Sequence, residues 1–417
     1  MDSKAEELLA SFDLHRVDLG LERIKAFLKE QGNPEKDLNY VHVTGTNGKG
    51  STSAFIASAL KEEGFKTGLY LSPHLKSFGE RIQINGEQIN EKELEKLVLE
   101  AGELKKKTGI DLSYFEFITA IAFKHFSEKK CDFVVLEVGM GGRLDATNVV
   151  VPKASVITPI SIEHSRHLGD TIGKIAVEKA GIIKEGVPVV SAFQEKEALE
   201  VIEKKCKELN AWLSLASRDF SHIRRSSSLE LQEFDYISQE NEFKGLKIRL
   251  AGRHQFVNAA VATRVMEILK LSEKAIRKGL EKAFIPGRLQ VIKTKPLVLI
   301  DVAHNPGAAK ILKEALRELF PEQKALFVLG VSEDKDINGI VSELAFVAES
   351  FVCTQAKFRG MNAEKIRLSI LENGFTGEIK VEPEVKNAVL FALSKKKPLT
   401  VFTGSFFSVS EALQAME

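Results

Sequence analysis

The sequence predicts an α/β fold with two parts: a large amino-terminal domain on a mostly parallel sheet, and a smaller carboxyl-terminal domain with Rossmann-like alternation. Three observations predict it. Short apolar segments alternate with segments of helical period along most of the chain. A glycine-rich turn that contains a lysine joins an early apolar segment to a helical one. The alternation is interrupted by a stretch with two prolines and a glycine, and then restarts.

The first domain is predicted from apolar segments that are each followed by a helix-period segment. Strands are expected at 40–44, 67–71, 132–139, 154–158 and 187–193, and helices from about Ser51, near 113–128 and from near Gln255. Because parallel strands need long crossover connections, this order indicates a parallel sheet wrapped by helices.

Two segments of this domain indicate antiparallel structure. Asn85-Gly86 stands between alternating apolar positions in 81–89 and predicts a hairpin. The stretch 211–250 is rich in strand-like alternation, and we expect it to add antiparallel structure to the side of the main sheet.

A domain boundary is predicted within 284–296, the stretch that carries the two prolines and the glycine. We therefore expect domains at 1–288 and 289–417. Beyond the boundary the alternation restarts, with strands expected at 297–301, 325–330, 350–354 and 399–404.

Composition limits the possible partners. The 59 basic and 58 acidic side chains nearly cancel, so no global field attracts nucleic acid or an anionic membrane. No apolar run approaches the roughly 20 residues of a membrane span. The three cysteines are far apart, without metal-ligand spacing, which is typical of a reducing compartment. We expect a cytoplasmic protein, monomeric by default.

The stretch "TGTNGKGS" (44–51) indicates an anion site. Gly45, Gly48 and Gly50 allow a tight turn whose amides point inward, and the following helix presents its positive end to the same place. Lys49 would meet the outer phosphates of a polyphosphate, and Ser51 could give Mg²⁺ a hydroxyl ligand. The spacing departs from the common phosphate-loop pattern, because Gly50 separates the lysine from its hydroxyl residue. A purely structural turn is the alternative.

Two further strand ends carry candidate ligands. Glu137 ends a buried-looking strand before a loop with three glycines, where open α/β sheets hold ligands and metals. It is the leading Mg²⁺ candidate, and pairing with a core arginine is the alternative. After the strand near 154–158 come His164 and His167, either of which could be an ordinary polar group. Lys179, on the helix that follows, would by itself be interpreted as a solvated surface lysine.

In the second domain, "LIDVAHNPGA" (299–308) ends a strand with Asp301 and His304. Arg288 lies just before it in "PGR" (286–288). Each residue is weak evidence alone, and Arg288 fits an ion pair at a hinge as well as a phosphate clamp.

Together these motifs resemble the folylpolyglutamate synthase and dihydrofolate synthase family of the Mur ligase superfamily. The resemblance covers nearly the whole length and rests on "TGTNGKGS", "SPHL", "EVGMGGRLDATN", "EKAGIIK", "GRHQFVNA", "PGRL", "DVAHNP", "SEDKD" and "TGSFF". It implies a P-loop-type ATPase domain followed by a ligase domain. It also implies an ATP-dependent ligase that adds L-glutamate, through an acyl phosphate and a γ-linked amide, to tetrahydrofolate (poly)glutamates, with dihydropteroate as a further acceptor left open.

The resemblance also implies residue roles. The ATP contacts would be Gly45, Thr46, Asn47, Gly48, Lys49, Gly50, Ser51, Asn258, Arg288, Asp301 and His304. The metal ligands, for two Mg²⁺ sites, would be Ser51, Ser72, Glu137, His164 and a carbamylated Lys179. The folate contacts would be Ser72, Arg81, Ser113, Tyr114, Phe115, Glu116, Leu144, Asp145 and Ala146. Lys49, His164, Lys179 and His304 would act in catalysis.

The chain departs from the family pattern at Glu163, where aspartate is usual, at Val302, where glycine is usual, and in 356–364. The last departure leaves the glutamate pocket without assigned residues. Two rival functions stay open: a peptidoglycan-type amino-acid ligase, which usually carries an extra amino-terminal domain for which about 40 residues leave no room, and a nucleotide-dependent switch.

Overall fold

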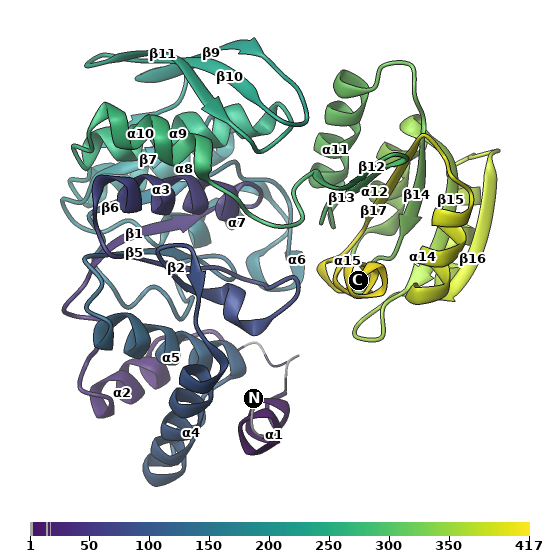
Figure 1. Cartoon of the computed structure of the whole chain (residues 1–417). Coiled ribbons are helices and arrows are strands. Elements are labelled where there is room, and N and C mark those ends of the chain that lie inside the picture. The colour runs from purple at the N-terminus through teal and green to yellow at the C-terminus, as the bar shows by residue number, and fades with distance from the viewer. Residues whose placement is uncertain (1–2, 14–15, 17) are drawn as a thin grey trace. The chain divides into compact units, whose positions relative to one another are not determined.

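The computed structural model describes residues 3–13, 16 and 18–417, and it divides into two compact units (Figure 1). The first unit holds the residues up to 223, together with 235–246 and 257–283. The second holds 224–234, 247–256 and 284–417. The α/β class expected from the sequence is confirmed in both units. The domain division between residues 288 and 289 stays a prediction.

The first unit is built on an eight-stranded sheet with the order β4-β3-β2-β5-β1-β6-β7-β8. Its strands are β1 (Asn39–Thr44), β2 (Thr67–Tyr70), β3 (Ile82–Ile84), β4 (Glu87–Gln88), β5 (Phe133–Glu137), β6 (Ala154–Ile157), β7 (Val189–Ser191) and β8 (Leu213–Leu215). The pairs from β2 to β8 are parallel, while β3 and β4 are antiparallel. The predicted strands of this domain are confirmed.

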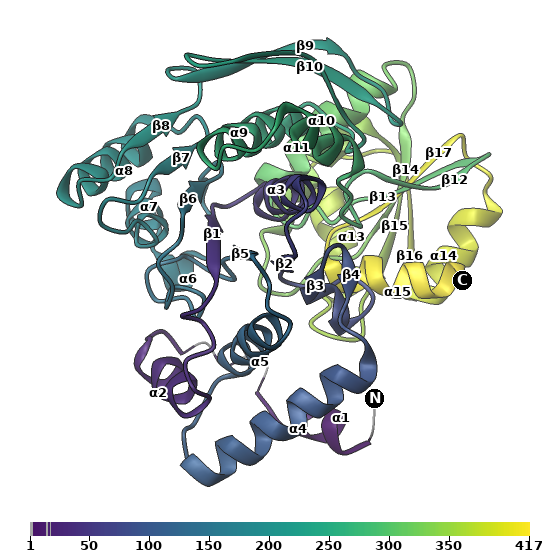
Figure 2. The same cartoon turned by 60° about the vertical axis from the view of Figure 1, so that its left-hand side comes forward.

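Helices cover both faces of this sheet (Figure 2). The helices that lie wholly in this unit are α1 (Ser3–Ala10), α2 (Glu22–Glu30), α3 (Lys49–Glu63), α4 (Glu91–Thr108), α5 (Tyr114–Glu128), α6 (Ser165–Leu168), α7 (Ile172–Ala180), α8 (Lys196–Glu208) and α10 (Glu273–Lys282), with the short 3-10 helix η1 (Phe78–Arg81). Tyr40, Tyr70 and Leu136 project from one face into a core with α2, α4 and α5. The helices α3 and α10 pack against each other on the opposite side.

The hairpin predicted at 81–89 is present as β3 and β4. Asn85 and Gly86 both have positive φ, 53° and 79°, as a tight two-residue turn requires. The expectation for 211–250 was wrong in part. The segment β8 joins the main sheet in parallel with β7, whereas β9 (Phe220–Ser226), β10 (Gln232–Ser238) and β11 (Glu242–Ile248) form a sheet of their own. Their connections are too short for parallel crossovers, so these three strands are antiparallel.

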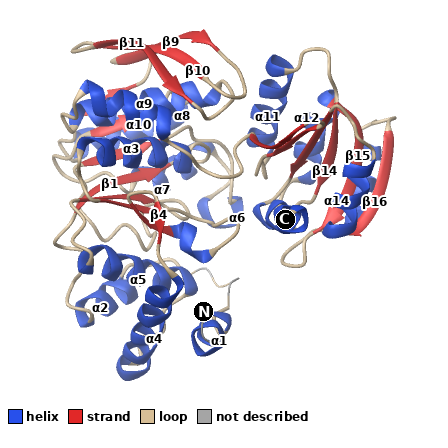
Figure 3. Cartoon of the chain, viewed as in Figure 1, coloured by secondary structure: helices blue, strands red, loops and turns tan. Residues whose placement is uncertain are grey.

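The second unit is built on a six-stranded sheet with the order β12-β13-β17-β14-β15-β16 (Figure 3). Its strands are β12 (Gln290–Thr294), β13 (Leu297–Ile300), β14 (Ala325–Leu329), β15 (Ala348–Gln355), β16 (Glu378–Glu384) and β17 (Leu399–Thr403). Only β12 is antiparallel, and neither β12 nor β16 was expected. The helices are α11 (Pro306–Leu319), α12 (Ile337–Leu344), α13 (Ala363–Glu372), α14 (Val385–Ser394) and α15 (Phe406–Met416), with the 3-10 helix η2 (Ala345–Val347).

The long helix α9 (His254–Ile268) begins in the residues of the second unit and continues in those of the first. None of the helices in the described part of the chain combines the length and the apolar character needed to span a bilayer.

The order of the main sheet positions the candidate site. Because β5, β1 and β6 are parallel neighbours, their carboxyl ends meet at one edge. The loops that start after Thr44, Glu137 and Ile157 therefore emerge side by side, and among the residues singled out from the sequence they hold 45–48, 144–146 and His164.

A close helix contact beneath this site can be tested by substitution. A Cβ on Gly279 of α10 would lie 2.3 Å from Ala59 Cα of α3, a backbone atom that cannot move alone. We expect Gly279→Ala to lower the free energy of unfolding by about 1–3 kcal/mol, since overpacking outweighs the gain in helix propensity. Urea unfolding followed by circular dichroism measures it.

Gly102→Ala on α4 is the matched control, because its Cβ would meet only the end of the Leu8 side chain, 2.4 Å away, which can rotate. Its free energy of unfolding should stay unchanged or rise by up to about 1 kcal/mol. Equal losses in the two variants would contradict the close-contact explanation.

Candidate nucleotide and metal site

The glycine-rich turn after β1 needs glycine at two positions. Gly45 has φ 140°, and a Cβ there would lie 1.9 Å from Thr158 Oγ1. Gly48 has φ 90°, and a Cβ there would lie 2.3 Å from Asn258 Oδ1. Both backbone conformations are disfavoured for other residues. The turn therefore lies directly against the end of β6 and against α9.

Lys49 is the first residue of α3, and its side chain folds back over the turn. Its Nζ donates to Gly45 O and Thr46 O, at 3.0 Å each. The N-cap residue of α3, Gly48, has no side chain to bond the first amides of this 15-residue helix. Amides at the start of a helix favour an anion. The turn thus gathers a cation and a helix N-terminus at one place.

Lys179 is buried directly behind the turn, contrary to the solvated position expected from the pattern alone. Its side chain is 1% exposed, and Nζ donates to Gly45 O at 2.7 Å and to Glu163 Oε1 at 3.0 Å. Burial lowers the pKa of Lys179 to about 8, although Glu163 opposes this shift. This lysine therefore contacts the glycine-rich turn and is far easier to deprotonate than a surface lysine.

Glu163 is a site residue that sequence reasoning missed, since it was noted only as a departure from aspartate. Burial would raise its pKa, but the positive charges of Lys49, Lys179 and His164 outweigh burial and bring the pKa to about 2. The carboxylate therefore stays ionised beside Lys179. The sequence did contain a signal for this role, because Glu163 is an acidic residue directly before the candidate ligand His164.

Glu137 and Ser72 are brought together at the same edge of the sheet. Glu137 is 5% exposed at the end of β5, and its Oε2 accepts a hydrogen bond from the Ser72 backbone N–H at 3.0 Å. His164 is the N-cap residue of α6 and has φ 49°. In the part of the chain that the structure describes, no group of three or more His, Cys, Asp or Glu side chains forms a metal site by itself.

Among the predicted folate contacts, two carboxylates hold local structure. Glu116 completes a capping box with Ser113 at the start of α5, and Arg23 Nε lies 3.2 Å from its carboxylate. Asp145 is buried and accepts from the backbone N–H groups of Met140 and Thr147, at 2.9 and 3.0 Å. The two acids fix the position of their neighbours.

The other predicted folate contacts lie in η1, on α5 and in the loop after β5. Arg81 Nε donates to His74 Nδ1 at 2.7 Å, and its guanidinium lies 5.9 Å from the Phe78 ring centroid. Tyr114 and Phe115 are half-buried on the first turn of α5, and Leu144 and Ala146 flank Asp145 in the loop after β5.

The residues predicted in the second unit converge around the end of β13. Asp301 accepts from the backbone N–H groups of Leu289 and Ala303, at 2.9 and 2.8 Å. His304 Nδ1 lies 2.9 Å from Val302 O. Arg288 makes no ion pair with any residue that the structure describes, so the hinge ion pair considered for it is not formed.

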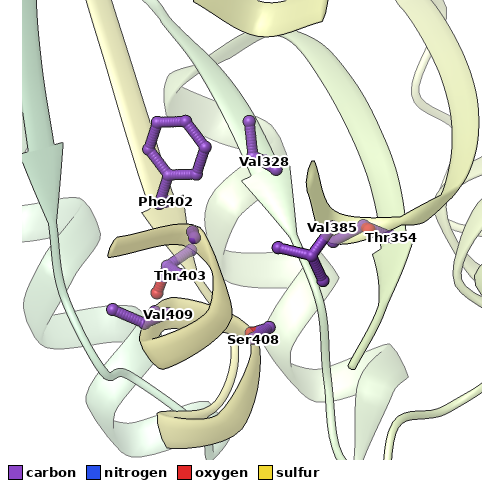
Figure 4. A pocket seen from close by; sticks show the side chains of 8 residues that line it. Val328, Thr354, Val385, Phe402, Thr403, Ser408 and Val409 are labelled. Atoms are coloured by element: carbon purple, nitrogen blue, oxygen red, sulfur yellow. The ribbon is translucent and has the colours of Figure 1, made fainter. Parts of the chain in front are cut away.

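The second unit also contains a small enclosed gap between its sheet and helices α14 and α15 (Figure 4). Its lining is mainly apolar, and the space is too small to hold a water molecule. We interpret it as imperfect packing and not as a substrate site.

Comparisons with known proteins identify the family of the chain. The Mur ligase middle domain family matches residues 43–266, and the Mur ligase glutamate ligase domain family matches 287–406. A dihydrofolate synthase/folylpolyglutamate synthase of Bacillus subtilis is 36% identical, over 95% of this chain and 94% of that protein.

Two solved structures are similar over nearly the whole chain. A Mycobacterium tuberculosis folylpolyglutamate synthase complexed with ADP has a TM-score of 0.92 at 31% identity, covering 99% of this chain and 97% of the other. Escherichia coli FolC in complex with DHPP and ADP has a TM-score of 0.90 at 31% identity, with the same coverage. The chain therefore belongs to the dihydrofolate synthase/folylpolyglutamate synthase family of Mur ligases.

Proposed function

We propose that this chain is an ATP-dependent ligase that adds L-glutamate through a γ-linked amide to tetrahydrofolate (poly)glutamates, with dihydropteroate as a further acceptor. The observation that carries the proposal is the turn at 45–48, with Lys49 and the α3 N-terminus directed at one place. The family and the nucleotide in the related structures support it.

The chemistry explains why such a turn is needed. A carboxylate is a poor electrophile at neutral pH, so the γ-phosphoryl group of ATP is first transferred to the folate carboxylate. The amine of glutamate then attacks the acyl carbon, and phosphate leaves. Both the triphosphate and the carboxylate are anionic, so cations at the phosphates are required. Lys49 and the amides of the turn would supply this stabilisation.

The oxygen donors at the sheet edge fit Mg²⁺. Glu137 is a nearly buried carboxylate with Ser72 fixed beside it, and Ser51 lies on the first turn of α3. Hard oxygen ligands, few in number and completed by phosphates, are what Mg²⁺ prefers. We propose that Ser51, Ser72, Glu137 and His164 hold two Mg²⁺ ions, which would neutralise phosphate charge.

We propose that Lys179 reacts with CO₂ to form a carbamate. A neutral amine is required for that reaction, and the lowered pKa of about 8 makes it accessible. The change would convert a cation into an anion and would replace the ion pair with Glu163. The product would be a further oxygen ligand for Mg²⁺ behind the turn.

We also propose that the remaining residues divide between the substrates. Asn258, next to Gly48, would meet the adenine, and Arg288, Asp301 and His304 would act on the phosphate side. Arg81 and Tyr114, with their neighbours in both loops, would contact the folate. The near-zero net charge supports an enzyme that works without nucleic acid, and the three free cysteines fit a reducing cytoplasm. A monomer is the simplest form.

The first test is the product. The pure protein is incubated with Mg·ATP and labelled glutamate, with dihydropteroate or tetrahydrofolate offered separately, and mass spectrometry counts the glutamates added. We expect labelled γ-glutamyl product and one ADP per residue added. Slow ATP hydrolysis that neither folate nor glutamate accelerates would instead support the nucleotide-dependent switch.

Lys49→Ala is expected to lower kcat by at least about a hundredfold, the scale for removing one oriented donor at a developing negative charge. The circular dichroism spectrum should stay unchanged, because Lys49 bonds only the carbonyls of its own turn. Lys92→Ala, at an exposed position of α4, is the control and should keep full activity. A Lys49→Ala enzyme with normal turnover would remove the assigned role.

The carbamate predicts a dependence on bicarbonate. Enzyme kept in CO₂-free buffer should lose activity, and added bicarbonate should restore it. Reactivation should be faster as pH rises through about 8, because only the deprotonated amine reacts and the ammonium form dominates below its pKa. Lys179→Arg should be weakly active and insensitive to bicarbonate. Activity of the native enzyme that is the same with and without CO₂ at every pH would contradict the carbamate.

A further inference from the structure

Three segments of the second unit meet where the side chains of Arg288 and His304 contact the ring of Phe406, the first residue of α15. The Arg288 guanidinium carbon lies 5.6 Å from the ring centroid. The His304 ring centroid lies 5.8 Å from it, with the two planes at 53°. Phe406 is half-buried. One aromatic side chain therefore contacts both groups that we assign to the phosphate side of the nucleotide in this unit.

Backbone hydrogen bonds fix these three segments to one another. Gly404 N donates to Ala303 O at 3.1 Å, which ties the start of α15 to the loop that carries His304. Val302 N donates to Gly287 O at 3.0 Å, which ties that loop to Arg288. The backbone next to the ring is thus tied to the segments that carry His304 and Arg288.

Arg288 gains an orientation from this contact without losing hydrogen-bond donors. In the described part of the chain it has no carboxylate within ion-pair distance. Asp301 attracts it only at longer range, and both oxygens of Asp301 accept from backbone N–H groups. A guanidinium on an aromatic face is attracted through the ring quadrupole, while its five N–H donors lie in its own plane. The donors therefore stay available for an anion such as a phosphate.

We propose that Phe406 is a positioning residue that holds the Arg288 guanidinium and the His304 ring for the nucleotide phosphates. The inference rests on the proposed function, because it presupposes that Arg288 acts on ATP. Phe406 itself makes no bond to the nucleotide; it acts through the two side chains that pack on it. No residue of the sequence-based site assignment has this role.

The neighbouring Phe407 provides a matched comparison. It is also aromatic, half-buried and on the first turn of α15, but it packs on Phe358, with ring centroids 4.9 Å apart at 78°. A general contribution of aromatic packing to stability would be similar at the two positions. Only the substitution at 406 should affect Arg288.

The experiment compares three variants by steady-state kinetics with Mg·ATP varied. Phe406→Leu keeps apolar volume but removes the aromatic face, and kcat/KM for ATP should fall about 3- to 30-fold, the scale of a partly buried cation–π contact. Phe406→Tyr should stay within about twofold of the native enzyme, since it restores the face. Phe407→Leu should also stay within about twofold. Equal losses in Phe406→Leu and Phe407→Leu would overturn the proposal.

A double-mutant cycle then separates positioning from stability. In an Arg288→Ala background, Phe406→Leu should lower kcat/KM for ATP by a much smaller factor than in the native enzyme. The reason is that the guanidinium which Phe406 orients through the cation–π contact is gone. If Phe406→Leu lowered kcat/KM for ATP by the same factor in that background, the positioning role would be overturned while the proposed function stayed intact. If Arg288→Ala alone left kcat/KM for ATP unchanged, both the assigned role of Arg288 and the positioning by Phe406 would be overturned, although folate-dependent turnover would still identify the ligase.

Discussion

The close approach of the 45–48 turn to its surroundings is the constraint on which the rest of the candidate site depends. At Gly45 and Gly48 the space that a Cβ would need is already occupied by Thr158 and Asn258. The turn therefore lies directly against Thr158 and Asn258, and it is fixed by hydrogen bonds from Thr46 N to Pro159 O and from Thr46 Oγ1 to Ser161 O, each 2.9 Å long. Since the turn is fixed, its carbonyls are fixed as well, and both Lys49 and Lys179 take their positions from the carbonyl of Gly45.

The charges around the turn would favour a bound anion. Two lysines contact Gly45 O, and one ionised carboxylate, Glu163, pairs with the deeper of them. One positive charge is therefore in excess in a region with little solvent, where an unpaired charge is costly. A bound phosphate would offset this excess. The pKa of Lys179 is lowered first by burial, which Glu163 opposes, and the charge of Lys49 adds to the lowering.

Much of the fold could be predicted from the sequence because each central strand can be recognised from its own residues. The apolar runs of β1, β5 and β14 are buried on both faces, so they are recognisable without knowledge of their partners. The strand β16 is an edge strand with alternating charges and proline, and β12 lies inside the stretch taken as a boundary; neither carries that signal. The separate sheet of β9–β11 was misplaced because the choice of pairing partner is not local.

Site residues could be predicted where the backbone conformation requires a particular residue type. They could not be predicted where their role depends on burial. Glycines at 45 and 48 are visible as a pattern, whereas the burial of Lys179 depends on how α7 packs against the sheet edge. The same distinction applies in the second unit. Arg288 was recognisable from "PGR", but its orientation comes from Phe406, which is more than a hundred residues away in the sequence. Each unit thus holds one cation ready for an anion by a different means: carbonyl oxygens fix Lys49, and an aromatic face fixes Arg288. In the described part of the chain neither cation has a carboxylate within ion-pair distance, although the charge of Lys49 acts on Glu163 and that of Arg288 acts on Asp301 at longer range.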